Sequence, residues 1–221
     1  MNGTITVNDN STISLSSAAG TDAQTVCINS PMVTITYAIG GGGTGATITS
    51  GTLPAGVTGS YAAGVFTISG MPTAPGNFSY QLTTTGPCLN AAISGMITVN
   101  TLPGASFTGL AGPYCADAAV VSLTSTQTGG IFSGPGVTDN ADGTATFNAS
   151  AAGAGTHSIT YIYTDGNGCT NSSFQSVTVN ATTSSSSTQN KTICSQELPY
   201  TWDGLTFAAA GTQIKTGLNN A

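Results

Sequence analysis

The chain has 221 residues, of which only 2 are Lys or Arg and 8 are Asp or Glu, so its formal net charge is −6. Charged residues make up 5% of the sequence, against about 25% in an ordinary soluble domain. Two basic residues cannot form a phosphate-binding surface or a polybasic membrane patch, which excludes nucleic acid as a partner. Hydrophobic residues reach 39% and alternate with polar ones, which argues against disorder.

Residues 1–8 begin the chain without the basic region and apolar stretch of a signal peptide. They read as a strand that starts abruptly, so we expect them to be the last strand of a preceding repeat and the chain to be a piece of something longer. No apolar run approaches the roughly 18 residues of a spanning helix, so we expect no membrane span in this segment.

A short motif recurs along the chain. Thr-Val-Asn stands at 6–8, 98–100 and 178–180, and each copy ends a short apolar–polar alternation. Each copy is followed by a stretch rich in Ser, Thr, Pro and Gly, and then by the first cysteine of a unit: Cys27, Cys115 and Cys194. A period of this size is typical of an array of similar units.

A second landmark supports the same period. Residues 75–82 correspond to 154–163, and a third copy begins at 210–214. We therefore predict four parts: 1–8, the last strand of a preceding repeat; 9–101, an Ig-like repeat; 102–181, a second Ig/PKD-like repeat; and 182–221, an incomplete third repeat.

Each unit has the pattern of an all-β fold. Phe78, Tyr80 and Leu82 share one face of a strand, and Ile159, Tyr161 and Tyr163 do the same. Further runs with a period of two cover 33–39, 65–68, 93–99, 120–123 and 174–179. Gly-rich and Pro-rich turns separate them at 40–45, 53–56, 133–136 and 165–168. The prediction is an all-β chain of tandem immunoglobulin-like β-sandwich domains with one disulfide each.

Five cysteines bear on that prediction, and none lies in a C-x-x-C pair. With a single His there is no zinc-binding pattern, so we expect no metal and no other cofactor. The gaps of 61 and 54 residues suit the pairs Cys27–Cys88 and Cys115–Cys169. Sequence alone does not settle connectivity, so this pairing is a choice. Cys194 is expected to be unpaired because its partner was cut away, and disulfides indicate an oxidising, extracytoplasmic location.

Three groups of segments resemble repeats of large bacterial surface proteins. Residues 25–31, 53–57 and 66–76 look like putative Ig and PKD-like repeats; 114–115, 129–137 and 161–169 resemble a second repeat type; and 193–204 resembles the start of a third. The mixture is similar to the giant cell-surface adhesins of gliding Bacteroidota, the SprB-type gliding motility adhesins.

That resemblance implies export by the type IX system and display as a long filament on the cell surface. Neighbouring repeats of the same long chain are then the first partners. Surface polysaccharide is a further candidate partner, and cell-surface motility machinery would be reached through other parts of the chain. The resemblance supplies no catalytic residues.

Other candidate sites were weighed against ordinary structural interpretations. The glycine run at 40–45 matches G-x-G-x-x-G, but a β-like segment follows it, which favours a loop over a phosphate site. His157 lacks a nucleophile elbow and is interpreted as a strand-edge residue. The Asp-containing segments 139–143 and 165–168 are interpreted as hairpin turns, with calcium as the alternative. Trp202 is interpreted as core of the incomplete repeat, with sugar stacking as the alternative.

The function predicted from the sequence is a structural and adhesive repeat segment of a large secreted cell-surface adhesin filament, serving gliding motility and surface attachment. The alternative is a carbohydrate-binding or spacer module of a secreted polysaccharide-degrading enzyme. We predict that the chain itself is not an enzyme, because no set of residues combines a nucleophile, a base and an oxyanion site.

Overall fold

The structure is a computed structural model that describes residues 1–182, 195–202 and 205–208. Its first half contains eight strands and one short 3-10 turn, η1 (Thr21–Ala23). The strands are β1 (Ser11–Leu15), β2 (Thr25–Cys27), β3 (Ile35–Gly41), β4 (Gly45–Gly51), β5 (Val57–Ala62), β6 (Val65–Gly70), β7 (Gly76–Thr85) and β8 (Ala92–Asn100).

These eight strands form two four-stranded sheets with the strand orders β1-β3-β6-β5 and β2-β8-β7-β4. With β1 as strand A and β3 to β8 as strands B to G, the sheets have the A-B-E-D and G-F-C orders of an immunoglobulin-like sandwich. The additional strand β2 pairs in parallel with β8, whereas the other pairings are antiparallel. The strand order itself therefore identifies the fold.

The second half repeats this arrangement with the orders β13-β14-β11-β9 and β10-β16-β15-β12. Its short strand β10 pairs in parallel with β16, as β2 does with β8. The elements are β9 (Phe107–Thr108), β10 (Tyr114–Cys115), β11 (Val121–Ser125), β12 (Ile131–Ser133), β13 (Val137–Asp139), β14 (Thr144–Phe147), α1 (Ala149–Ala152), β15 (Gly155–Thr164) and β16 (Thr170–Asn180).

The predicted all-β, immunoglobulin-like class is confirmed. The strands expected near 65–68, 93–99, 120–123 and 174–179 are β6, β8, β11 and β16, and the run at 33–39 corresponds to β3 two residues later. Period-2 alternation finds these strands because one face of each is buried. The parallel strands β2 and β10 were not predicted, since three- and two-residue strands are too short to show a period.

Tyrosines on strands B and F join the two sheets of the first sandwich. Tyr37 on β3 and Tyr80 on β7 are almost fully buried, and their hydroxyl groups share a hydrogen bond of 2.8 Å. Burial raises the pKa of both hydroxyl groups, because the charged phenolate would lose its hydration. In antibody domains a disulfide joins strands B and F, and here this tyrosine pair connects the same two strands.

The second sandwich has a separate core. Aromatic rings fill its centre: Phe132 packs edge-on against Phe107 at 5.2 Å between centroids and lies 4.7 Å from Tyr161. The Tyr161 hydroxyl donates a hydrogen bond to the Gln127 carbonyl. The buried residues of each core all come from one half of the chain, so each sandwich supplies its own hydrophobic interior.

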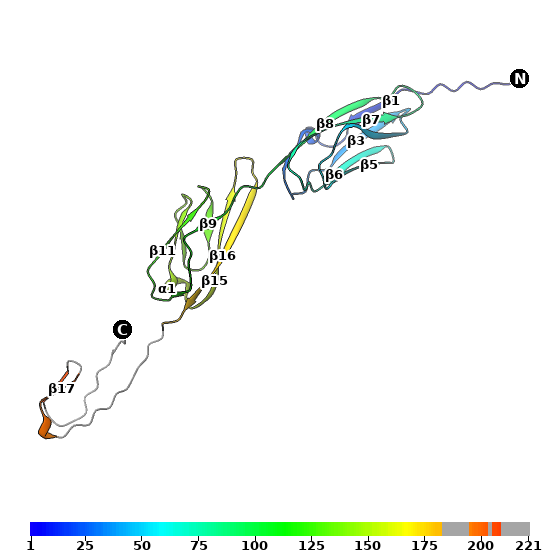
Figure 1. The fold of residues 1–221 in the computed structure, drawn as a ribbon. Coiled ribbons are helices and arrows are strands. Elements are labelled where there is room, and N and C mark those ends of the chain that lie inside the picture. Colours follow the sequence, from blue (N-terminus) through cyan, green and yellow to red (C-terminus); the bar gives the residue numbers. More distant parts are fainter. Residues whose placement is uncertain (183–194, 203–204, 209–221) are drawn as a thin grey trace.

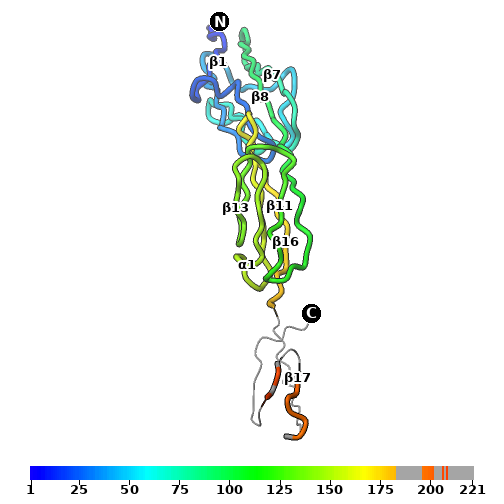
Figure 2. The backbone as a smooth tube through the Cα atoms, turned by 90° about the vertical axis from the view of Figure 1, so that its left-hand side faces the viewer, coloured from blue at the N-terminus to red at the C-terminus, as the bar shows by residue number. Residues whose placement is uncertain are grey.

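The two sandwiches lie end to end, joined by residues 101–106 (Figure 1). The view turned by 90° shows the same elongated arrangement, with the β15–β16 hairpin reaching back toward the first sandwich (Figure 2). No strand of one sandwich pairs with a strand of the other within the described residues.

The two ends of the chain carry less structure. Residues 1–8, predicted as the last strand of a preceding repeat, form no strand here and are exposed. In the segment predicted as an incomplete third repeat, the described residues form η2 (Ser195–Glu197) and a hairpin of β17 (Tyr200–Trp202) and β18 (Leu205–Phe207). The predicted domain boundaries at 8/9, 101/102 and 181/182 stay predictions.

Candidate functional site: a disulfide-linked junction

The chemical feature that links the two sandwiches is a disulfide between Cys27 and Cys169. Its sulfur atoms are 1.98 Å apart, its Cα atoms are 5.6 Å apart, and 142 residues separate the two cysteines in sequence. It joins the first sandwich to the second, beside the segment that connects them. We call this region the junction: Cys27, Cys169, Asn100 and residues 101–106.

Strand β2 brings Cys27 to the junction. Because β2 runs parallel to β8, its last residue Cys27 lies opposite Asn100, the last residue of β8. Ile28 continues this pairing by donating its backbone N–H to the Asn100 carbonyl at 2.8 Å. The Cys27 thiol group is therefore held at the end of the first sandwich from which the chain leaves.

The turn between β15 and β16 presents Cys169. The Asp165 carboxylate accepts hydrogen bonds from the backbone N–H groups of Asn167 at 2.9 Å and Cys169 at 2.8 Å. The Asp165 N–H donates to the Cys169 carbonyl at 3.0 Å, which closes the turn. Cys169 is fully buried, so the tip of this hairpin is covered at the junction.

Two side-chain hydrogen bonds attach strand β16 to the connecting segment. Asn171 donates its amide to the Pro103 carbonyl at 2.8 Å, and Gln175 donates to the Phe107 carbonyl at 2.7 Å. The six-residue connection is thus held both by the disulfide and by polar contacts. Sequence analysis missed these two side chains, because a single amide in a Ser/Thr-rich strand gives no pattern.

The predicted disulfide pairing was wrong. Cys27 bonds to Cys169, not to Cys88, and Cys115 is not bonded to Cys169. The reason is the length of the strands between the predicted partners. Nine-residue β8 separates the end at Cys27 from the end at Cys88 by about 30 Å, at roughly 3.3 Å per residue. A disulfide needs Cα atoms within about 7 Å, so one bond per sandwich is impossible here.

The other cysteines divide into two groups. Cys88, half-buried, and Cys115, exposed, both carry free thiols. Cys194, predicted to be unpaired by truncation, lies outside the described residues.

The remaining sequence candidates lie far from one another in the fold. The glycine run at 40–45 is the turn between β3 and β4, as the loop interpretation predicted. His157 stands near the start of β15, and its Nε2 lies 2.8 Å from the Gly153 carbonyl. The side chain of Trp202 is outside the described set, so its predicted core position stays a prediction.

The acidic segments form hydrogen-bonded turns. The Asp142 carboxylate accepts from the Thr144 N–H at 2.8 Å and from the Thr144 hydroxyl at 2.6 Å. These hydrogen bonds hold the pKa of Asp142 below its usual value, because they stabilise the charged form. Within the described part of the chain, no three His, Cys, Asp or Glu residues are grouped so that they could hold a metal ion.

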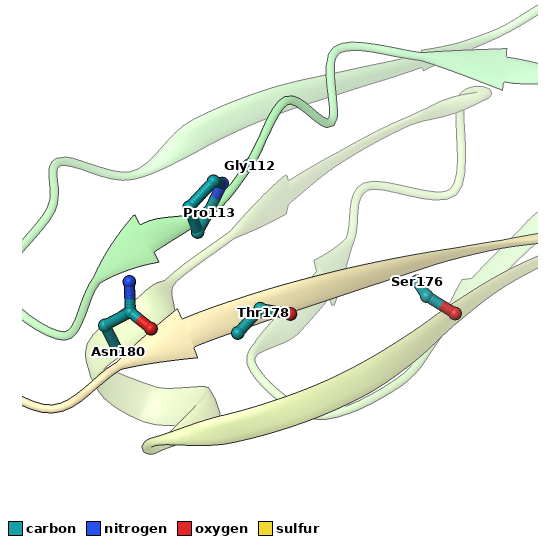
Figure 3. Close-up of a pocket in the computed structure, with 5 residues that line it drawn as sticks. All are labelled: Gly112, Pro113, Ser176, Thr178 and Asn180. Carbon is teal, nitrogen blue, oxygen red and sulfur yellow. The ribbon is translucent and has the colours of Figure 1, made fainter.

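A depression lies along the outer edge of the second sandwich. Its lining residues are small or neutral and come from β16 and the segment before β10 (Figure 3): Gly112, Pro113, Ser176, Thr178 and Asn180. It borders Cys115, whose register partner is Asn180. In the described segments, no helix has the length and hydropathy needed to cross a membrane.

Comparison with known proteins places no family name on the chain. No protein-family model matches it, and no curated protein matches it. Among solved structures it is similar to titin domains Z1Z2 in complex with telethonin, with 12% identity, 73% of this chain and 93% of that chain covered, and a TM-score of 0.35. Clostridium thermocellum CbhA fibronectin(III)-like modules match with 11% identity, 77% and 95% coverage, and a TM-score of 0.31.

Glycoside hydrolases are also similar. The endo-fucoidan hydrolase MfFcnA4 from glycoside hydrolase family 107 matches with 15% identity over 79% of this chain and a TM-score of 0.35. The chain spans less than a third of the length of the three endo-fucoidan hydrolase chains it matches, at 28%, 29% and 32%. The immunoglobulin-like assignment therefore rests on the strand order, and the chain is an all-β protein of this class with a disulfide typical of oxidising compartments.

Proposed function

We propose that the chain is a structural and adhesive repeat segment of a large secreted cell-surface adhesin filament, of the kind that serves gliding motility and surface attachment. The observation that carries this proposal is the Cys27–Cys169 disulfide. A covalent bond between successive sandwiches has a clear use where a chain must transmit force over a distance, because it prevents the units from separating.

The position of the bond supports a load-bearing role. When the chain is pulled at its ends, the force crosses from Cys27 to Cys169 through the disulfide. The residues between these cysteines belong to a closed covalent loop, so most of both sandwiches is shielded from the load. The connecting segment is short and contains Pro103, which further limits bending between the units.

The composition supports an exposed, extracellular setting. Few charges give a surface whose interactions depend little on salt, and disulfides persist outside the reducing cytoplasm. Neighbouring repeats of the same chain are the first partners, with surface polysaccharide as a further one. Motility machinery is contacted through other parts of the filament.

Labelling of intact cells tests the proposal. Antibodies raised against this chain are expected to decorate filaments on the surface of the producing cells, and deletion of the gene is expected to reduce surface attachment and gliding. Detection of the chain only inside cells would overturn the proposal. Specific, saturable binding on a glycan array, lost on Trp202→Ala, would instead support the alternative, a carbohydrate-binding module of a polysaccharide-degrading enzyme.

A further inference from the structure

The two free thiols of the described chain lie at the positions that the disulfide occupies at the junction. Cys115 ends β10 and lies opposite Asn180 at the end of β16, just as Cys27 ends β2 and lies opposite Asn100 at the end of β8. The next backbone bond also repeats: Ala116 donates to the Asn180 carbonyl at 2.9 Å. Cys115 is therefore the Cys27 position of the second sandwich.

Cys88 is the Cys169 position of the first sandwich. Each lies in the turn between strands F and G, Cys88 between β7 and β8 and Cys169 between β15 and β16. Counted back from the equivalent residues Val99 and Val179, which both pair with the first residue of strand F, Cys88 is 11 residues away and Cys169 is 10. The repeat has thus kept both halves of the junction disulfide in each sandwich.

A contact at the N-terminal end points to the missing partner independently of this comparison. The Cys88 thiol lies 3.3 Å from the carbonyl oxygen of Asn8 and donates a hydrogen bond to it. Asn8 ends the first Thr-Val-Asn motif, and its equivalent in the next copy is Asn100, which lies opposite Cys27. A cysteine paired with Asn8 in the same register would therefore lie next to the Cys88 sulfur.

The two thiols cannot meet within one chain. Cys88 lies at the end of the first sandwich near the N-terminus, and Cys115 lies beside the end of β16, at the opposite end of the pair of sandwiches (Figure 1). Each faces the place where another unit would continue the end-to-end arrangement.

We propose that Cys88 and Cys115 are the two half-sites of further inter-unit disulfides of the Cys27–Cys169 kind. Cys115 bonds to the F–G turn cysteine of a unit placed after it, and Cys88 bonds to the β2-type cysteine of a unit placed before it. The partner is a second unit of the same kind, so this inference deepens the proposed function and rests on it.

The reaction is an ordinary thiol oxidation. Two thiols lose two protons and two electrons as one S–S bond forms. A small-molecule disulfide such as oxidised glutathione accepts them, and its own S–S bond is reduced to two thiols. Every unit would then be linked covalently to both of its neighbours, with overlapping loops along the array.

Two single-thiol variants of the full chain test the selectivity of the half-sites. The first keeps Cys88 and carries Cys115→Ser and Cys194→Ser; the second keeps Cys115 and carries Cys88→Ser and Cys194→Ser. Both retain the Cys27–Cys169 bond, which peptide mapping checks. The two variants are isotope-labelled differently and oxidised with glutathione disulfide, alone and mixed, and disulfide-linked dimers are followed on non-reducing gels.

The mixture is expected to form Cys88–Cys115 dimers at least about tenfold faster than either variant forms dimers alone, because the docked units raise the effective concentration of the two thiols. A control variant carries its only free thiol on the outer face of β7, through Ser79→Cys with Cys88, Cys115 and Cys194 all changed to Ser. Its mixture with the Cys115 variant is expected to show no such acceleration.

Equal rates for the mixed and unmixed proteins would overturn this inference. If the Cys27–Cys169 bond is present in the same samples, that result leaves the proposed load-bearing function standing. If the Cys27–Cys169 bond is itself absent from protein made under oxidising conditions, the proposed function fails together with the inference.

Discussion

Reduction of the Cys27–Cys169 bond should lengthen the fully unfolded chain by an amount that identifies the bond. The disulfide spans 142 residues, and an extended chain gains at most about 3.3–3.6 Å per residue. The oxidised chain, pulled at its ends, should therefore stop about 470–510 Å short of the length reached by the reduced chain. The loop hides this length whichever sandwich unfolds first.

The pairing that the sequence favoured gives a different number. Cys27–Cys88 and Cys115–Cys169 would close loops of 61 and 54 residues, together 115, and would hide about 380–415 Å. The two cases differ by roughly 90 Å, and the second would be released in two separate steps instead of one.

Optical tweezers attached at both termini provide the assay. The protein carries Cys88→Ser, Cys115→Ser and Cys194→Ser, so that no other thiol can exchange with the disulfide, and it is stretched before and after addition of dithiothreitol. The same protein with Cys27→Ser is the control and should behave as the reduced chain throughout. Full extension of the oxidised chain without reductant would refute the load-shielding argument.

Three further predictions concern the core of the first sandwich and are checked by chemical denaturation. Tyr80→Phe should lower the free energy of unfolding by about 1–3 kcal/mol, because it leaves the buried Tyr37 hydroxyl without its partner, whereas the double change to Phe at both positions should be closer to neutral; equal losses for both variants would contradict this. Stability should be constant below pH 10 and fall above it, since the raised pKa of both tyrosines means that the unfolded chain loses these protons first; with free thiols alkylated, a double Phe variant that shows an unchanged slope would contradict the assignment. Gly95→Ala should cost about 1–3 kcal/mol, because a Cβ would lie 2.3 Å from the Tyr80 hydroxyl oxygen, while Gly104→Ala, with no atom within 4 Å, should change little and is the matched control.

The order of strands was accessible from the sequence because its cause is local. Alternation of apolar and polar residues requires one buried face, and the runs ending in Leu82, Val99 and Tyr161 each show it without reference to the rest of the chain. The recurrence of Thr-Val-Asn likewise predicted a repeat, and the structure shows why the motif recurs: Val99 and Val179 are buried near the ends of equivalent G strands.

The connectivity of the cysteines was not accessible, because it depends on which ends of the strands come together in space. Sequence separation favoured Cys27 with Cys88, and only the parallel pairing of β2 with β8 places Cys27 at the far end of the sandwich, opposite Asn100. The β15–β16 hairpin of the next sandwich then brings Cys169 to it. Local patterns determined that this chain is built of β-sandwich units; long-range packing alone decided that its disulfide joins the units instead of closing each one.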